Sequence, residues 1–186
     1  EYRILNTDYK SACGGAELIC SYTRFQMLAN KNILLGITGS IAAYKAAEII
    51  RQLKEQEYSV SVLMTKEAER FITPLTLGSL CGENAHRDMF EDDQSWSMSH
   101  IRLAREIDIF LIAPATANII GKIASGLADD LLTCTAMATK AKIIMAPAMN
   151  DGMYQNKIVQ NNIEKLKNLG IRFVEPIRGS LACGTF

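Results

Sequence analysis

The stretch Ile33-Leu34-Leu35-Gly36-Ile37-Thr38-Gly39-Ser40-Ile41-Ala42-Ala43 decides the fold class of this chain. Residues 33–37 form a short apolar run, which predicts a buried strand. Thr38, Gly39 and Ser40 end the run, and apolar positions at helical spacing follow over residues 41–56. A strand that passes through a short glycine turn into a helix is the unit from which α/β folds are built.

The same alternation continues to the end of the chain. Helices are expected over residues 67–71, 74–80, 100–106, 117–138 and 155–169, and strands over 59–64, 107–113, 142–146 and 171–174. Pro114 is expected to close the third of the five strands, and Gly170 to cap the last helix. Alternating elements imply βαβ units, and continuously apolar strands fit a sheet covered on both faces. The sequence therefore predicts an α/β fold, a three-layer Rossmann-type parallel sheet with helices on both faces.

Length and composition predict one domain with a sizeable core. The 186 residues are 48% hydrophobic and 22% charged, as is ordinary for a globular protein. Twenty basic and twenty acidic residues give a formal net charge of zero, so no electrostatic signature of nucleic acid or membrane binding is present. No apolar run reaches the roughly 18 residues of a membrane span. We expect neither nucleic acid nor membrane as a partner.

The five cysteines are odd in number and form no CxxC pair. This pattern indicates neither a disulfide framework nor a metal site, and it predicts a reducing, cytoplasmic compartment. Residues 1–30 are irregular, with a weak helical pattern near 16–28, and we interpret them as an extension of unknown role. Residues 31–186 are expected to form the functional domain. A polar stretch over 83–99 predicts a loop.

The stretch Pro147-Ala148-Met149-Asn150-Asp151-Gly152-Met153-Tyr154 is the strongest functional signal. It directly follows an apolar strand, yet proline removes a backbone donor and asparagine favours turns, so the stretch is poor core design. At the carboxyl end of a parallel strand it would lie where α/β sheets bind their ligands. The alternative is a strand-to-helix turn with incidental methionines.

The turn at Gly39 and Ser40 is a candidate phosphate site. Backbone N–H groups at a helix N-terminus bind anions, Gly39 allows close approach, and the Ser40 hydroxyl adds a donor. The turn is neither a G-x-G-x-x-G fingerprint nor a Walker A loop, and Thr65 stands where a dinucleotide fold places an acidic residue. These features favour a mononucleotide over NAD. The alternative is a plain serine N-cap.

Three further stretches contain candidate functional residues. The stretch Ala113-Pro114-Ala115-Thr116-Ala117-Asn118 offers small residues for a flat ligand, with polar anchors, although Thr116 also suits an N-cap. His100 lies at a loop-to-helix boundary, where it is either an acid–base group or a solvated surface residue. Cys183, beside Gly184, is either a proton donor on a loop or an incidental thiol.

Together these stretches resemble the homo-oligomeric flavin-containing cysteine decarboxylases. The resemblance extends over residues 31–186 and is specific in the Pro-x-Met-Asn-x-x-Met segment with its upstream histidine. The resemblance is greatest to those family members that act in coenzyme A biosynthesis, either as a free enzyme or as the amino-terminal half of a bifunctional protein. The matching segments are residues 39–43, 62–65, 71–75, 100–101, 114–118, 126–132, 147–154 and 182–184.

The resemblance implies a flavodoxin-like fold that binds FMN at a subunit interface, in trimers or in dodecamers built from trimers. It assigns the phosphate to Gly39, Ser40 and Ile41, with Thr65 nearby. It assigns the isoalloxazine to residues 114–117 and Ala148. These cofactor-binding residues are Gly39, Ser40, Ile41, Thr65, Pro114, Ala115, Thr116, Ala117 and Ala148.

The resemblance also implies the reaction. The substrate would be 4′-phosphopantothenoylcysteine, held by Asn150 and Met153, with Asn150 on its carboxylate. Oxidation of the thiol to a thioaldehyde, with His100 as proton acceptor, makes loss of CO₂ feasible because an enethiolate forms. FMN would be the oxidant in that step. Cys183 would then protonate the enethiolate, the reduced FMN would return the hydride, and the product would be 4′-phosphopantetheine with no net oxidation.

Two other activities remain open on this resemblance. Relatives that decarboxylate the C-terminal cysteine of a peptide stop at the enethiol and lack the Ala-Cys-Gly segment that includes Cys183. Other relatives are non-catalytic FMN-binding regulatory subunits, and the presence of His100, Asn150 and Cys183 argues against that class. A flavin prenyltransferase is disfavoured by the Pro-x-Met-Asn segment. The chain departs from the family pattern after Gly184, where further glycines are expected, and over residues 1–30.

Overall fold

The computed structural model describes residues 31–89 and 98–176, so the expected helix near 16–28, residues 90–97 of the expected loop and Cys183 lie outside the described residues. A five-stranded parallel sheet in the order β2-β1-β3-β4-β5 forms its centre. Leu35 in β1, which lies between β2 and β3, is opposite Val62 of β2 and Leu111 of β3. The strands are β1 (Asn32–Ile37), β2 (Ser59–Met64), β3 (Ile109–Ala115), β4 (Lys142–Pro147) and β5 (Arg172–Phe173).

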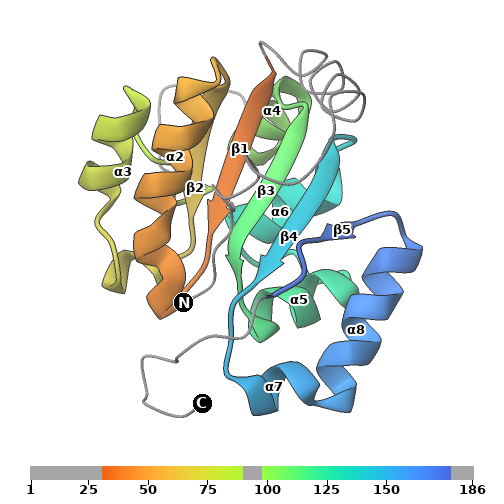
Figure 1. The fold of residues 1–186 in the computed structure, drawn as a ribbon. Coiled ribbons are helices and arrows are strands. Elements are labelled where there is room, and N and C mark those ends of the chain that lie inside the picture. Colours follow the sequence, from red (N-terminus) through yellow and green to blue (C-terminus); the bar gives the residue numbers. More distant parts are fainter. Residues whose placement is uncertain (1–30, 90–97, 177–186) are drawn as a thin grey trace, which may run out of the picture.

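Helices cover both faces of this sheet, which confirms the predicted three-layer, flavodoxin-like α/β fold. Figure 1 shows α2 and α3 together on one side and α4 and α6 behind the sheet. The α-helices are α2 (Ala46–Glu55), α3 (Pro74–Cys81), α4 (Ser99–Glu106), α5 (Ala117–Ala124), α6 (Leu131–Ala138), α7 (Asp151–Gln155) and α8 (Lys157–Asn168). Two short 3₁₀ helices are η1 (Ile41–Lys45) and η2 (Ala68–Arg70).

Alternation along β1 builds two cores. Leu35 and Ile37 pack with Ile50 of α2 in the core on one face, whereas Leu34 joins Phe110 of β3 in the core on the other. Successive strand side chains point to opposite faces, so a continuously apolar strand supplies both cores at once. Helices α4, α5, α6 and α8 contribute to the second core.

The strand β3 is shifted by two residues from the prediction, because it begins at Ile109 and continues through Pro114 to Ala115 instead of ending at residue 113. Its pairing with β4 shifts register between Ile112 and Ala115, so Pro114 lies at an irregularity of the ladder. Proline is tolerated there because no ladder hydrogen bond requires its missing N–H. The extension carries Ala115 and Thr116 to the edge of the sheet.

One predicted helix is divided in two, and two others begin differently from the prediction. The segment 117–138 forms α5 and α6, because Gly126 adopts a φ of 71° and Asp130 then caps a new helix. The segment expected as one helix over 155–169 is preceded by α7, and Asn156 caps α8. Gly170, at φ 91°, follows the end of α8 as expected. The predicted helix over 41–56 begins as η1.

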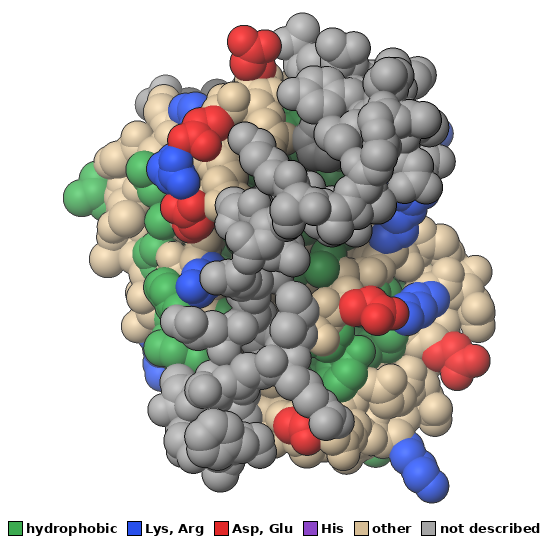
Figure 2. Space-filling model, in the orientation of Figure 1, with side chains coloured by type: hydrophobic (Ala, Val, Ile, Leu, Met, Phe, Trp, Pro, Cys, Tyr) green, Lys and Arg blue, Asp and Glu red, His purple; other side chains and the backbone are tan. Residues whose placement is uncertain are grey.

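Figure 2 shows acidic and basic side chains interspersed over the described part of one face, with neither sign gathered into a patch. This distribution agrees with the formal net charge of zero. Within residues 31–89 and 98–176, no helix is both long and apolar enough to cross a membrane.

Gly36→Ala is expected to lower the free energy of unfolding by about 1–3 kcal/mol, because a Cβ there overpacks the second core. That atom would lie 2.9 Å from Cε2 of Phe110 and 3.2 Å from Cδ1 of Leu132. Gly121→Ala is the matched control, since its Cβ would meet only Asn162 Nδ2, at 3.8 Å. Because Gly121 lies within the helix α5, Gly121→Ala is expected to raise the free energy of unfolding by about 0.5–1 kcal/mol. Urea unfolding measures both, and equal stabilities would contradict the packing argument.

Candidate functional site

A cavity of about 360 Å³ lies at the carboxyl ends of β1, β2, β3 and β4. In a parallel sheet these ends meet at one edge, so loops distant in sequence converge there. The loops after the four strands, and the start of α6, supply its walls. The lining residues are Thr38, Gly39, Ser40, Thr65, Glu67, Thr116, Ala117, Asn118, Ile119, Asp130, Ala148, Met149 and Met153.

The turn after β1 is packed tightly against the loop after β2. A Cβ on Gly39 would lie 2.4 Å from the Cβ of Glu67, so only glycine allows this approach. Ser40 caps η1, and its Oγ accepts a hydrogen bond from the N–H of Ala42 at 3.3 Å. The glycine predicted to admit a phosphate therefore also joins two loops that border the cavity.

The Thr65 hydroxyl is the one buried side-chain polar atom in the described part of the chain that has no hydrogen-bond partner. Thr65 is only 8% exposed, and it lines the cavity. An unsatisfied buried hydroxyl costs about 1–3 kcal/mol, so such a group is expected to meet a ligand. A hydroxyl donor next to a tight glycine turn suits a phosphate, and the residues present therefore fit a flavin mononucleotide.

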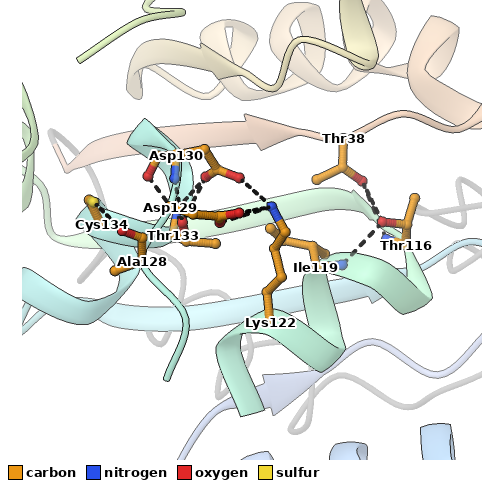
Figure 3. A network of polar contacts seen from close by, with 9 residues as sticks. All are labelled: Thr38, Thr116, Ile119, Lys122, Ala128, Asp129, Asp130, Thr133 and Cys134. Carbon is orange, nitrogen blue, oxygen red and sulfur yellow. Dashed lines mark hydrogen bonds and ion pairs between the residues drawn. The ribbon is translucent and has the colours of Figure 1, made fainter. Parts of the chain in front are cut away.

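A threonine pair fixes the cavity wall at β3 (Figure 3). The buried Thr38 Oγ1 donates to the Pro114 carbonyl at 2.7 Å and accepts from the Thr116 N–H at 3.3 Å. Thr116 Oγ1 in turn accepts from the N–H of Ile119 and caps α5. The Ala148 N–H donates to the Ala115 carbonyl at 3.1 Å, which ties the loop after β4 to the same wall.

Near the C-terminal end of α5, Lys122 forms ion pairs with two aspartates. Lys122 Nζ lies 2.9 Å from both carboxylate oxygens of Asp129 and 3.1 Å from Oδ2 of Asp130 (Figure 3). The hydrogen bond with Asp129 raises the pKa of Lys122 and lowers the pKa of Asp129. Asp130 forms a capping box with Thr133, whose N–H donates to Oδ1 at 2.8 Å. The cation therefore neutralises a carboxylate at the cavity wall.

Lys122→Met should lower stability at neutral pH, and this loss should shrink as the medium becomes acidic. The pKa of Asp129 is held below its ordinary 3.8, so its stabilising contribution is present above that pH and is lost as the pH falls below it. Urea unfolding between about pH 6 and about pH 3 measures the difference. Lys140→Met, which removes an exposed lysine that forms no ion pair with the other described residues, should show no such trend. A pH-independent loss would contradict the electrostatic origin.

The structure brings most of the predicted site residues to one place. Ile41 is 57% exposed and is not among the residues that line the cavity. Pro114 and Ala115 are buried in β3 behind the wall and contribute their carbonyl groups to the contacts above. The predicted residues that line the cavity are Gly39, Ser40, Thr65, Thr116, Ala117, Ala148 and Met153.

Asn150 is exposed between Met149 and Met153, both of which line the cavity. It caps α7, because its Oδ1 accepts from the N–H of Gly152 at 2.9 Å. This bond fixes the amide plane and uses the acceptor, whereas the Nδ2 group makes no hydrogen bond within the described residues. The Nδ2 group of Asn150 is therefore free to donate a hydrogen bond, and a carboxylate ligand would need such a donor.

His100 is half-buried in the first turn of α4 and does not line this cavity. The resemblance assigns catalytic roles to His100, Asn150 and Cys183. Of these three, only Asn150 is next to the cavity, since Cys183 lies outside the described residues. Cys81 and Cys134 are the cysteines that the structure describes. Burial raises the pKa of the Cys81 thiol to about 11 and raises that of Cys134, so both are poor thiolates.

Two lining carboxylates, Glu67 and Asp130, were not predicted from the sequence. The spacing Asp130-Leu131-Leu132-Thr133 is a helix-start signal, which could have separated α6 from α5 and brought Asp130 to a loop. Glu67 carries no such signal, since its neighbourhood depends on the approach to Gly39. Among the described residues, no group of three His, Cys, Asp or Glu side chains is placed to hold a metal ion.

A ligand cavity at the carboxyl edge of a doubly covered parallel sheet is typical of nucleotide-binding α/β proteins. Residues 21–185 match the family model described as Flavoprotein, and the chain belongs to that family. This result and the relatives below confirm the resemblance that the sequence motifs indicated.

Two relatives illustrate the range of the family. The Coenzyme A biosynthesis bifunctional protein CoaBC of Vibrio vulnificus (strain YJ016) is 46% identical over 159 residues, which are 86% of this chain and 40% of that protein. The chain thus spans well under half of this relative. A probable phosphopantothenoylcysteine decarboxylase of Streptococcus mutans is 44% identical over 156 residues, 83% of this chain and 87% of that protein.

Solved structures share the fold at similar coverage. The FMN-dependent cysteine decarboxylase SpaF superposes with a TM-score of 0.78 at 32% identity, covering 82% of this chain and 87% of its own. A mutant of PPC decarboxylase complexed with pantothenoylaminoethenethiol superposes with a TM-score of 0.75 at 33% identity, covering 83% of this chain and 87% of its own.

Proposed function

We propose that this chain is a flavin-dependent decarboxylase that converts 4′-phosphopantothenoylcysteine into 4′-phosphopantetheine. The observation that carries the proposal is the cavity at the carboxyl edge, whose walls contain seven of the predicted cofactor and substrate residues and the unpartnered hydroxyl of Thr65. The name of the Streptococcus relative supports this substrate, and the name of the Vibrio relative supports a role in coenzyme A biosynthesis.

In this proposal the cofactor is FMN, which supplies the electron sink that a simple amino-acid carboxylate lacks. Gly39 and Ile41 hold the phosphate with their backbone N–H groups, and Ser40 and Thr65 donate their hydroxyls, since the Ser40 N–H already donates to the Thr38 carbonyl at 2.9 Å. The small residues at the end of β3, with Ala148 from the next loop, leave room for the flat ring. The carbonyl contacts of Pro114 and Ala115 keep that wall rigid.

Asn150 binds the substrate carboxylate through its Nδ2 group, since its Oδ1 is already bonded to Gly152. Met153, 51% exposed at the mouth of the cavity, contacts the apolar part of the substrate. His100 accepts the proton when the thiol is oxidised, and Cys183 protonates the enethiolate after CO₂ leaves. The roles of His100 and Cys183 rest on the family resemblance.

We further propose that the site is completed by a second copy of the chain, in a trimer or in a dodecamer of trimers. His100 does not line the cavity of its own chain, which favours an arrangement in which it acts on the cavity of a neighbour. A homo-oligomer with rotational symmetry brings the same pair of surfaces together at every interface.

The test of the function is a visible absorption spectrum of the purified protein, followed by addition of 4′-phosphopantothenoylcysteine and mass analysis of the product. A yellow protein that forms 4′-phosphopantetheine is expected. A decarboxylase of the C-terminal cysteine of a peptide, which the family resemblance leaves open, is the second candidate, and bleaching of the flavin with an enethiol product would favour it. A colourless, inert protein would contradict both and favour a regulatory binding subunit.

A further inference from the structure

The charges around the cavity are unbalanced. Two of its lining residues, Glu67 and Asp130, carry carboxylates, and none of the described lining residues is a lysine or arginine. Asp130 is neutralised by Lys122 at 3.1 Å. Glu67 has no hydrogen bond or ion pair from its side chain in the part of the chain that the structure describes, and it gives η2 no side-chain cap.

The Glu67 side chain starts directly against the glycine turn. A Cβ built on Gly39 would lie 2.4 Å from the Cβ of Glu67 and 3.4 Å from its Cα, so the two residues are in van der Waals contact. The N–H of the buried Ala68 donates to the Thr65 carbonyl at 2.9 Å, which holds the backbone around Glu67 in a tight turn. The exposed Glu67 side chain therefore begins beside Gly39 and lines the cavity together with Thr65.

We infer that Glu67 determines how strongly the cavity selects a phosphorylated flavin, by repelling the phosphate that lies on the turn at Gly39. This inference rests on the proposed function, which places the phosphate there. A phosphate monoester carries a charge of about −1.5 to −2 at neutral pH, and a carboxylate nearby opposes it. The repulsion weakens the binding of FMN. It does not affect the binding of riboflavin, which has the same ring and ribityl chain without the phosphate.

The test is the dissociation constant of FMN and of riboflavin, measured by flavin fluorescence on the full chain after flavin removal. Glu67→Gln is expected to tighten FMN binding roughly three- to tenfold and to leave riboflavin binding unchanged, since one charge near the phosphate is removed in a solvent-exposed setting. The gain should shrink at about 1 M salt, where the Debye length is about 3 Å. Glu67→Ala should behave like Glu67→Gln.

Glu69→Gln is the matched control, because it removes the same charge from the same short helix, at a residue that does not line the cavity. It should change neither dissociation constant. Equal FMN affinities in wild type and Glu67→Gln would overturn the inference, as would weaker binding of both flavins, which would make Glu67 an acceptor for the ribityl hydroxyls. If the wild-type protein binds neither flavin, the proposed function fails, and this inference fails with it.

Discussion

Asn150→Asp is expected to reduce turnover by about 100-fold or more while leaving the fold intact. The aspartate keeps the oxygen that accepts the Gly152 N–H at 2.9 Å, and Asp caps a helix about as well as Asn. The other half of the side chain changes from an N–H donor to a carboxylate oxygen, which would face the carboxylate of the substrate. Steady-state kinetics and urea unfolding separate the two effects.

Asn156→Asp is the control for this prediction. Asn156 caps the next helix, α8, with the same geometry, because its Oδ1 accepts from the N–H of Ile158 at 2.9 Å. It does not line the cavity, so the same substitution should leave both turnover and stability unchanged. Normal turnover in Asn150→Asp would remove the amide from substrate binding, and a loss of stability in that variant alone would make its role structural.

The order of elements and the edge that carries the site were predictable from the sequence. The apolar strands and the amphipathic helices obey local periodicities, which need no knowledge of distant neighbours. Once the sheet is parallel, Ser40, Thr65, Thr116 and Ala148 must meet, because each follows the end of a strand. The pattern of strands and turns therefore suffices to place these four residues at one edge of the sheet.

Most of the remaining features depend on contacts between loops, which periodicity does not encode. Glu67 borders the cavity only because Gly39 allows the two loops to touch. β3 passes through Pro114 because its register with β4 shifts there. Lys122 joins Asp129 and Asp130 only because the predicted long helix breaks at Gly126. The first two features depend on tertiary contacts, whereas the break of the helix follows local signals at Gly126 and Asp130 that the helical periodicity alone does not include.

His100→Asn is expected to lower turnover by roughly 10²- to 10⁴-fold, because asparagine cannot accept the proton that the oxidation step releases. Flavin binding should survive, since His100 is not among the residues proposed to hold FMN. His86→Asn is the control. The strand-like contacts of His86 are made by its backbone, whose N–H and carbonyl bond with Val62 and Met64 at 2.8 Å, and a side-chain change leaves them in place. Full activity in His100→Asn would exclude the histidine from the reaction.

The two inactive variants can together locate the histidine. Consider an oligomer in which each cavity uses Asn150 of one chain and His100 of the next. Random mixing of His100→Asn with Asn150→Asp then gives about a quarter of the sites an intact pair, and activity returns. If His100 acted on its own cavity, every chain in the mixture would lack one of the two groups and no site would be complete. Co-expression followed by activity per bound flavin is the measurement. A mixture as inactive as its parents would contradict the shared site, while leaving the two single-variant results as they stand.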